Sequence, residues 1–201
     1  MQLWSTPSSP FARKVRVTIH ELGLTDRIEL VVVNPWTDPR LRALNPLAKV
    51  PTLVLDDGSA LFESGVICEY LDALASRPRL YPAPGPERWR ALRLQGLADG
   101  AATAAGRLFA DEHRPEHDRS QAVMRRLGLA IDGCLGALED EALFGERITI
   151  GDIAVAVFAE YLDFRWPDRD WRGARPRLAA GCARFAARSS MTSTPYATLA
   201  P

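Results

Sequence analysis

Two segments of the chain place a serine hydroxyl at a strand-to-helix junction. The first is S-S-P-F-A-R-K-V-R, Ser8 to Arg16, and the second is F-E-S-G, Phe62 to Gly65. A hydroxyl just before a helix meets free backbone N–H groups and the positive end of the helix dipole, which together favour an anion. Such a place suits a thiolate or a carboxylate. In each segment, taken alone, the competing interpretation is a plain helix cap.

The second junction and a proline segment before it suit a peptide-like ligand. Ser64 stands where a helix N-cap is expected, so its hydroxyl and the next amides can hold a carboxylate. Glu63 offers an acceptor for an ammonium group, and the pair therefore matches a γ-glutamyl group. In V-P-T-L, Pro51 lacks a donor and tolerates the cis form, so it can turn the backbone of Val50 outward as a free edge. A free edge can pair with a peptide, although a proline that only begins a strand gives the same pattern.

The elements that must position these residues alternate between strands and helices over the first 80 residues. Ile28–Val33 is continuous and β-branched, which predicts a buried strand, and Asp57-Gly58 predicts a hairpin turn. The order β-α-β-α-β-β-α is typical of a thioredoxin-like domain. We expect strands at Gln2–Ser5, Ile28–Val33, Thr52–Leu55 and Ala60–Phe62, and helices at Phe11–Leu22, Pro39–Leu44 and Ser64–Ala75.

After a proline-rich connection the strand signal disappears. Thr149 and Asp152 have the spacing of a reciprocal capping box, which predicts the start of a helix. The fold class is therefore α/β plus all-α, with a thioredoxin-like domain over residues 1–78 and a helical-bundle domain over residues 87–201. Helices are expected at Glu87–Glu112, Asp118–Leu138, Ile150–Asp163 and Pro176–Ser189.

Composition excludes several classes of protein. Of 201 residues, 25 are Lys or Arg and 25 are Asp or Glu, so the chain lacks the basic excess typical of nucleic-acid binding. No apolar run approaches a membrane span, and the N-terminus lacks the pattern of a signal peptide. The three cysteines form no C-x-x-C pair, and no metal-binding motif is present. We expect a cytoplasmic protein without metal, nucleic-acid or membrane partners, and with Cys68 in the core.

The order and spacing of these motifs resemble those of the cytosolic glutathione S-transferases. The resemblance covers S-S-P-F-A-R-K-V-R, N-P-L-A-K-V-P-T-L, L-F-E-S-G-V-I-C-E-Y-L and, in the helical half, I-T-I-G-D-I-A-V-A. Within that family the sequence is most similar to bacterial members and to classes that use a catalytic serine. What the family implies is a glutathione-binding thioredoxin-like domain, a helical substrate-binding domain, a homodimer and a role in detoxification.

The resemblance also implies a role for the first junction. Ser9, the residue before Pro10, occupies the position of the catalytic hydroxyl, which donates a hydrogen bond to the sulfur of glutathione. Ser8 and Phe11 are expected to contact glutathione. Because Ser8 and Ser9 are adjacent, the sequence leaves open which of them faces the sulfur.

The peptide part of glutathione is assigned to the other two motifs by the same resemblance. Its cysteinyl backbone is expected to pair with Val50, and Pro51 matches the cis-proline of the family. Glu63 and Ser64 match the residues that hold the γ-glutamyl end, and Lys49 is expected near the glycyl carboxylate.

The implied activity is attack of the glutathione thiolate on a small electrophilic substrate. Two other classes stay open: a non-catalytic binding protein with this fold, and a glutathione-dependent peroxidase, reductase or isomerase. The second substrate is expected between the two halves. Candidate residues for that pocket are Arg107, His113, Arg114, Tyr161 and Trp166.

Overall fold

The computed structural model describes residues 1–76 and 80–199, which form two compact units. Unit 1 consists of Met1–Arg88 together with the chain from Ala187 onward, and unit 2 consists of Trp89–Ala186. These units divide the chain differently from the ranges 1–78 and 87–201 expected as domains. Residue 78 lies outside the described residues, and the two ranges remain predictions.

Unit 1 is built on a mixed four-stranded sheet. Its strands are β1 (Gln2–Ser5), β2 (Glu29–Val32), β3 (Thr52–Val54) and β4 (Ala60–Phe62), in the spatial order β2-β1-β3-β4. β1 pairs in parallel with β2 and antiparallel with β3, and β3 and β4 form a hairpin. The parallel pair is joined through helix α1 (Pro10–Glu21), because a parallel connection needs a crossover. The thioredoxin-like arrangement predicted from the sequence is confirmed.

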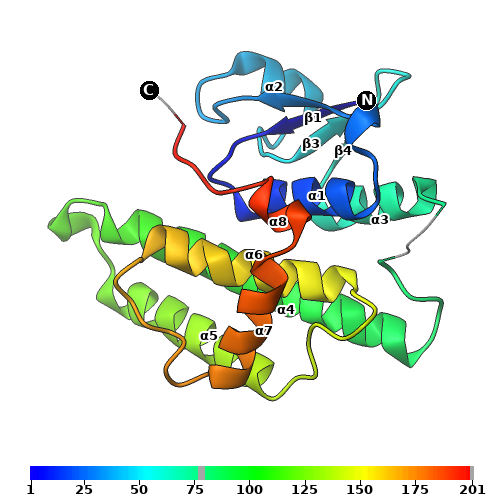
Figure 1. Ribbon diagram of the computed structural model, residues 1–201. Coiled ribbons are helices and arrows are strands. Elements are labelled where there is room, and N and C mark those ends of the chain that lie inside the picture. The colour runs from blue at the N-terminus through cyan, green and yellow to red at the C-terminus, as the bar shows by residue number, and fades with distance from the viewer. Residues whose placement is uncertain (77–79, 200–201) are drawn as a thin grey trace. The chain divides into compact units, whose positions relative to one another are not determined.

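Helices cover both faces of this sheet (Figure 1). The helices α1 and α3 (Ser64–Leu74) lie on one side, and the short helix α2 (Pro39–Leu44) lies on the other. On the α2 side, Trp4 packs with Val33 and Leu41 in a buried cluster. Successive side chains of a strand alternate between faces, so Leu3 and its partner Leu53, both fully buried, point to the side of α1 and α3.

The expected burial of Ile28–Val33 is wrong. The strand β2 is at the edge of the sheet, with Leu30 47% and Val32 55% exposed, and only Val33 just after it is buried. The sequence shows that these side chains are apolar, but whether they are buried depends on the place of the strand in the sheet. Because β2 pairs with β1 alone, these apolar side chains have no second strand beside them.

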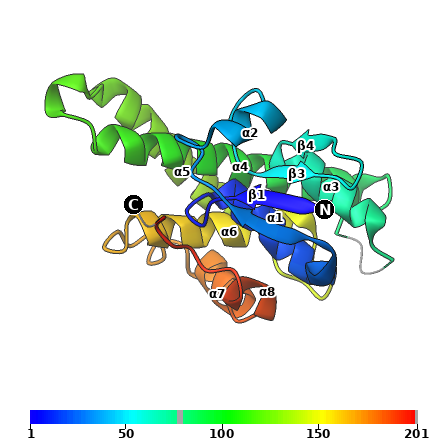
Figure 2. The ribbon, with the colours of Figure 1, turned by 90° about the horizontal axis from the view of Figure 1, so that it is seen from above.

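Unit 2 is all helical, as predicted. It contains α4 (Pro86–Glu112, whose first turn belongs to unit 1), α5 (Gln121–Glu139), α6 (Ile150–Arg165) and α7 (Pro176–Ala186). The two long helices α4 and α5 run side by side (Figure 2). Helix α7 packs against both α5 and α6. At Gly151 the helix α6 approaches α4 closely, since a Cβ there would lie 2.8 Å from the carbonyl oxygen of Ala91. Gly151 thus permits the crossing of these two helices.

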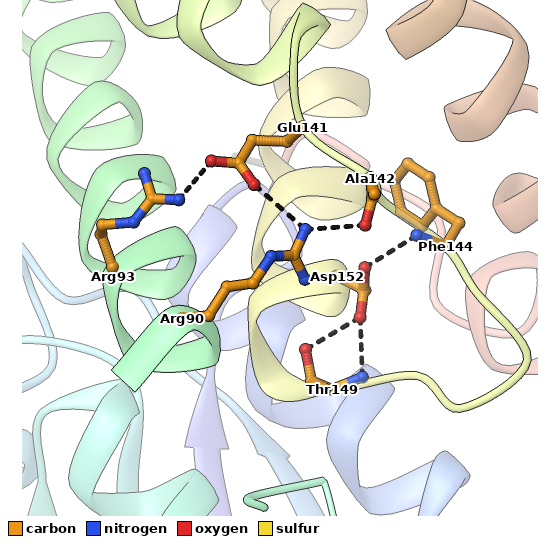
Figure 3. Close-up of polar contacts among 7 residues, drawn as sticks. All are labelled: Arg90, Arg93, Glu141, Ala142, Phe144, Thr149 and Asp152. Carbon is orange, nitrogen blue, oxygen red and sulfur yellow. Dashed lines mark hydrogen bonds and ion pairs between the residues drawn. The ribbon is translucent and has the colours of Figure 1, made fainter. Parts of the chain in front are cut away.

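A capping box begins α6 and ties down the loop before it (Figure 3). The backbone N–H of Thr149 donates to Asp152 Oδ2 at 2.8 Å, and the other carboxylate oxygen accepts from the N–H of Phe144 at 2.9 Å. The capping box predicted from the sequence is confirmed. Asp152 is buried, and these bonds satisfy its charge.

A second carboxylate fixes the same loop to α4 (Figure 3). Glu141 accepts hydrogen bonds from Arg93 and, at 3.0 Å, from Arg90, which also donates to the carbonyl of Ala142. The hydrogen bond from Arg93 is the main reason why the pKa of Glu141 is lowered. The arginines of α4 therefore stabilise the α5–α6 loop.

Two of three short elements change the predicted helix boundaries. A 3₁₀ turn at Thr25–Arg27 follows α1 and alters no expected helix. A second 3₁₀ turn, Glu116–Asp118, precedes α5, which begins three residues later than the Asp118 expected from the sequence. The expected helix Pro176–Ser189 is divided, because α7 ends at Ala186 and a separate helix α8 spans Ser189–Thr192. Among the helices described, none has the length and apolar character to cross a membrane.

Candidate functional site

The register of the sheet brings the three predicted segments of the site to one edge. Trp4 is paired with Thr52, and Thr52 is paired with Phe62. The chain therefore leaves β1, enters β3 and leaves β4 at the same end of the sheet. The loop of Ser8 and Ser9, the Val50–Pro51 peptide and the Glu63–Ser64 junction follow from these three strand ends.

At the first junction Ser9 is the N-cap of α1. Its backbone is extended, with φ −87° and ψ 124°, and its Oγ accepts from the N–H of Ala12 at 3.2 Å. The Ser9 N–H donates to the carbonyl of Thr6 at 3.2 Å, which closes the turn that carries Ser8. A hydroxyl has one donor and two lone pairs, so the cap leaves its proton to donate elsewhere. Capping a helix and donating to a sulfur are compatible roles for Ser9.

Ser8 and Phe11 lie on either side of the cap. Both are half-buried, Ser8 in the turn and Phe11 in the first turn of α1. The structure thus makes Ser9 rather than Ser8 the helix cap.

The segment before β3 presents an open backbone. The Val50–Pro51 peptide is cis, as the family resemblance implied. Within the described parts of the chain, neither the N–H nor the C=O of Val50 has a hydrogen-bond partner. Val50 is half-buried, and the neighbouring Lys49 is exposed. An extended peptide can satisfy such a backbone by strand-like pairing.

Asn45 holds this segment in place and was not predicted as a site residue. It is 1% exposed, and its Nδ2 donates to the carbonyl of Lys49 and to the hydroxyl of Thr52, both at 3.1 Å. The Thr52 hydroxyl donates to the same Lys49 carbonyl at 2.9 Å. The available signal was the N-P pair that opens N-P-L-A-K-V-P-T-L, since Asn often bonds to nearby backbone in turns. Asn45 therefore fixes the backbone on which Val50 is presented.

At the second junction the helix begins differently from the prediction. Glu63, and not Ser64, is the N-cap of α3, and Ser64 is the first helical residue. Glu63 has φ 71° and ψ 116°, a conformation that non-glycine residues rarely adopt, and it turns the chain directly from β4 into α3. The N-cap prediction for Ser64 is wrong because the sequence shows nothing of this backbone turn.

The start of α3 remains open for a ligand. The Glu63 side chain makes no capping hydrogen bond within the described chain and is exposed, whereas Ser64 is 5% exposed. The first-turn N–H groups of a helix have no intrahelical acceptor, so together with the Ser64 hydroxyl they suit a carboxylate. Glu63 beside them suits an ammonium group.

The residues predicted to line a second-substrate pocket all belong to unit 2, where most have partners. Arg107 and Arg114 pair with the buried carboxylate of Asp111 at 2.9 and 3.0 Å. The indole N–H of Trp166 donates to Glu112 at 2.7 Å. These contacts stabilise the ends of α4 and α6, and the role of these residues in a substrate pocket remains a prediction.

His113 and Tyr161 also have neighbours within unit 2. The ring of His113 lies beside that of Phe109, tilted by 38° with centroids 4.1 Å apart, and its Nδ1 lies 2.7 Å from the Phe109 carbonyl oxygen. Tyr161 lies under the guanidinium of Arg165, 5.1 Å from the ring centroid. His113 is exposed and Tyr161 is buried.

Metal-ligand clusters and exposed cysteines are both absent from the residues that the structure describes. In that part of the chain no group of three or more His, Cys, Asp or Glu side chains could hold a metal ion. Cys68, Cys134 and Cys182 are free and buried, which confirms the core position expected for Cys68. Burial raises the pKa of Cys134 and of Cys182 to about 12, so neither is a thiolate at neutral pH.

Two family profiles match the chain. The profile described as "Glutathione S-transferase, N-terminal domain" matches residues 8–74, and the one described as "Glutathione S-transferase, C-terminal domain" matches residues 116–180. The first match contains all three segments of the candidate site.

Three proteins match this chain over almost its full length. The "Uncharacterized GST-like protein YibF" of Escherichia coli is 30% identical, with 96% of this chain and 98% of that protein covered. A glutathione transferase family member from Pseudomonas fluorescens, solved with bound glutathione, is 36% identical with a TM-score of 0.93, and the match covers 98% and 99% of the two chains. A glutathione S-transferase from Methylobacterium radiotolerans, solved with glutathione sulfonate, is 36% identical with a TM-score of 0.90, covering 100% of this chain and 97% of that one.

Proposed function

This chain belongs to the glutathione S-transferase family, and we propose that it activates the thiol of glutathione for attack on a small electrophilic substrate. The observation that carries the proposal is the convergence of three strand ends at one edge of the sheet. A serine hydroxyl, an open backbone and an open helix start follow from those ends. Glutathione has a thiol, a peptide backbone and a γ-glutamyl group to match them. The two relatives solved with glutathione or its sulfonate support this choice of ligand.

Each part of glutathione is assigned to one segment. The cysteinyl backbone pairs with Val50, and Pro51 fixes the direction of that edge. The α-carboxylate of the γ-glutamyl group binds the hydroxyl of Ser64 and the first N–H groups of α3, while Glu63 accepts from its ammonium group. Lys49 pairs with the glycyl carboxylate.

Ser9 acts as a hydrogen-bond donor to the sulfur, with Ser8 and Phe11 beside it. A thiol with a pKa of about 8.5 is mostly protonated at neutral pH, and a hydrogen bond to the thiolate favours the charged form. One unit of lowering corresponds to about 1.4 kcal/mol. Serine stabilises the anion and does not remove the proton, which leaves to water. The sulfur then forms a bond to the electrophilic carbon, and the leaving group departs with the electron pair. We further propose that the enzyme is a cytoplasmic homodimer.

The decisive experiment compares Ser9→Ala with Ser8→Ala. The pKa of bound glutathione is measured from the ultraviolet absorbance of the thiolate as a function of pH, and glutathione affinity is measured by calorimetry. We expect Ser9→Ala to raise the thiol pKa by about one unit, and Ser8→Ala to leave it near the wild-type value. A rise with Ser8→Ala alone would reverse the assignment.

A second measurement separates the enzyme from a binding protein. Conjugation of glutathione to a chloronitroarene is assayed with the wild-type protein. Conjugation that Ser9→Ala slows supports the transferase. Tight glutathione binding with no conjugation of any electrophile in a broad panel, and with no glutathione-dependent peroxidase, reductase or isomerase activity, would show a binding protein instead. No glutathione binding would refute the proposed function.

A further inference from the structure

The C-terminal segment, residues 187–197, returns to the unit that carries the candidate glutathione site. Contacts group the chain from Ala187 onward with unit 1 and not with the helices that precede it. Helix α8 lies beside α1, and the chain after it runs toward the loop between β1 and α1 (Figure 1). Nothing in the spacing of this segment predicts the association.

The first anchor is an ion pair with the last residue of α1. Glu21 accepts from Arg188 Nε and Nη2, both at 2.8 Å, and from the hydroxyl of Ser190 at 2.5 Å. Burial by itself would raise the pKa of Glu21, but the hydrogen bonds from Arg188 and Ser190 outweigh it and hold the pKa below its usual value. A bidentate ion pair of this kind fixes the orientation of α8 as well as its position.

The second anchor is at Arg13, one turn into α1. Arg13 is 1% exposed, its Nη2 donates to the carbonyl of Met191 at 3.3 Å, and its guanidinium lies 4.3 Å from the centroid of the Tyr196 ring. On the next turn, burial and the neighbouring Arg13 lower the pKa of Arg16, and Tyr196 opposes that lowering. Tyr196 therefore lies against the positively charged face of α1, at Arg13, one helical turn after the Ser9 cap.

The third anchor reaches the loop itself. The N–H of Ala197 donates to the carbonyl of Pro7 at 3.5 Å. Pro7 is two residues before Ser9, inside the turn closed by the Ser9–Thr6 hydrogen bond. This bond is longer than a typical N–H···O bond, so its effect depends on Tyr196 and α8 holding the segment in place.

We propose that the C-terminal segment positions the Thr6–Ser9 loop through Tyr196 and Ala197, and so sets the direction in which the Ser9 hydroxyl points. The inference rests on the proposed function of Ser9. Tyr196 and Ala197 are positioning residues, since they touch the loop and its helix and act on the sulfur only through Ser9. A hydrogen bond weakens when its donor is displaced by a fraction of an ångström. Loss of the contacts of Tyr196 and Ala197 therefore leaves glutathione bound, but with a smaller fraction of its thiol ionised.

The test is a double variant, Tyr196→Ala with Ala197→Pro, in the full-length protein. It removes the ring over Arg13 and the N–H that binds Pro7, and it leaves α8 and the Glu21 pair unchanged. We expect the thiolate fraction of bound glutathione at neutral pH to fall about threefold, a rise of about 0.5 in the thiol pKa. Glutathione affinity should change little, because the segments of Val50 and Ser64 are untouched. The amide of Ser9 should exchange hydrogen faster.

Two matched controls show whether the effect is specific. Thr198→Pro places a proline one residue further along, where the N–H bonds to no described residue, and should leave the thiol pKa unchanged. Tyr196→Phe keeps the ring over Arg13 and should leave the thiol pKa unchanged. A double variant that binds glutathione with an unchanged thiol pKa and unchanged Ser9 exchange would overturn the inference. If the wild-type protein binds no glutathione, the proposed function fails, and amide exchange alone decides whether the segment holds the loop.

Discussion

The helices α1 and α3 both begin where a strand reaches the same edge of the sheet, yet their first turns are built differently. At α1 an extended Ser9 caps its own helix through Oγ. At α3 the cap residue Glu63 has a positive φ, and its side chain makes no capping bond within the described chain. One helix start is closed by the chain itself, and the other is left open.

The two helix starts show how one edge of a sheet can both bind and activate a ligand. A closed helix start presents a single directed hydroxyl, which suits a sulfur whose charge must be stabilised. An open helix start presents several backbone N–H groups, which suit a carboxylate that is already charged. Substitutions at α3 should therefore change glutathione affinity, whereas substitutions at α1 should change the ionisation of the thiol.

The largest expected effect is on affinity at the open start. Ser64→Ala removes one hydroxyl that binds the carboxylate, and a hydrogen bond to a charged group is worth about 1.5–3 kcal/mol, so glutathione should bind roughly 10- to 100-fold more weakly. Calorimetry measures the affinity. Ser59→Ala, in the β3–β4 hairpin where the hydroxyl bonds Asp57, is the control and should bind normally. Equal affinity in both variants would remove α3 from the site.

Next in size is the effect of the closed start on stability. Ser9→Ala should lower the free energy of unfolding by about 1 kcal/mol, the usual cost of losing a side-chain cap. Ser120, which caps α5 with its Oγ 3.5 Å from the N–H of Val123, provides the matched substitution in unit 2. Urea unfolding should show a loss for both variants, and only Ser9→Ala should also raise the thiol pKa. A thiol pKa that rises equally in both would show a general loss of structure.

A third change separates the backbone of Glu63 from its side chain. Glu63→Gly should stabilise the protein by about 1 kcal/mol, because glycine adopts a positive φ without a steric cost. The same variant loses the acceptor for the ammonium group and should bind glutathione more weakly. Urea unfolding and calorimetry on one preparation test both effects. A variant less stable than the wild type would show that this backbone turn is held by the side chain.

The smallest expected effect is on the pH dependence of stability, and it concerns the ion pair between the end of α1 and the start of α8. The folded pKa of Glu21 is below its unfolded value, so its pair with Arg188 and Ser190 contributes stability above the unfolded pKa, and this is lost as pH falls through the folded pKa. Glu21→Gln should therefore be less stable than the wild type at about pH 7 and nearly equal to it at about pH 3. A difference independent of pH would mean that packing, and not charge, holds α8.

Much of the fold follows from local sequence because its signals are local. The strands at Gln2–Ser5 and Ala60–Phe62 and the helix at Pro39–Leu44 have the predicted bounds, and the capping box of α6 forms as expected. The edge position of β2 could not be predicted in this way, since strand order depends on contacts far apart in the chain. The return of residues after Ala187 to unit 1 depends on contacts of the same kind, such as Arg188 with Glu21.

The candidate site was predictable in its residue types but not in its backbone. A serine before Pro10 and a proline after Val50 are visible in the sequence, and the structure shows the cap and the cis peptide there. The positive φ of Glu63 is invisible, because glutamate has no preference for that conformation. The role of Asn45 depends on its burial against Thr52, which only the folded chain reveals.

The exposed edge strand β2 also bears on how the protein behaves when concentrated. An edge strand with apolar side chains such as Leu30 and Val32 is a template on which another chain can add a strand. Here the strand is only four residues long, begins with the charged Glu29 and is followed two residues after Val33 by Pro35, which has no N–H to donate. A brief edge between a charge and a proline offers little backbone on which another chain could add a strand, even though its apolar residues remain in contact with solvent.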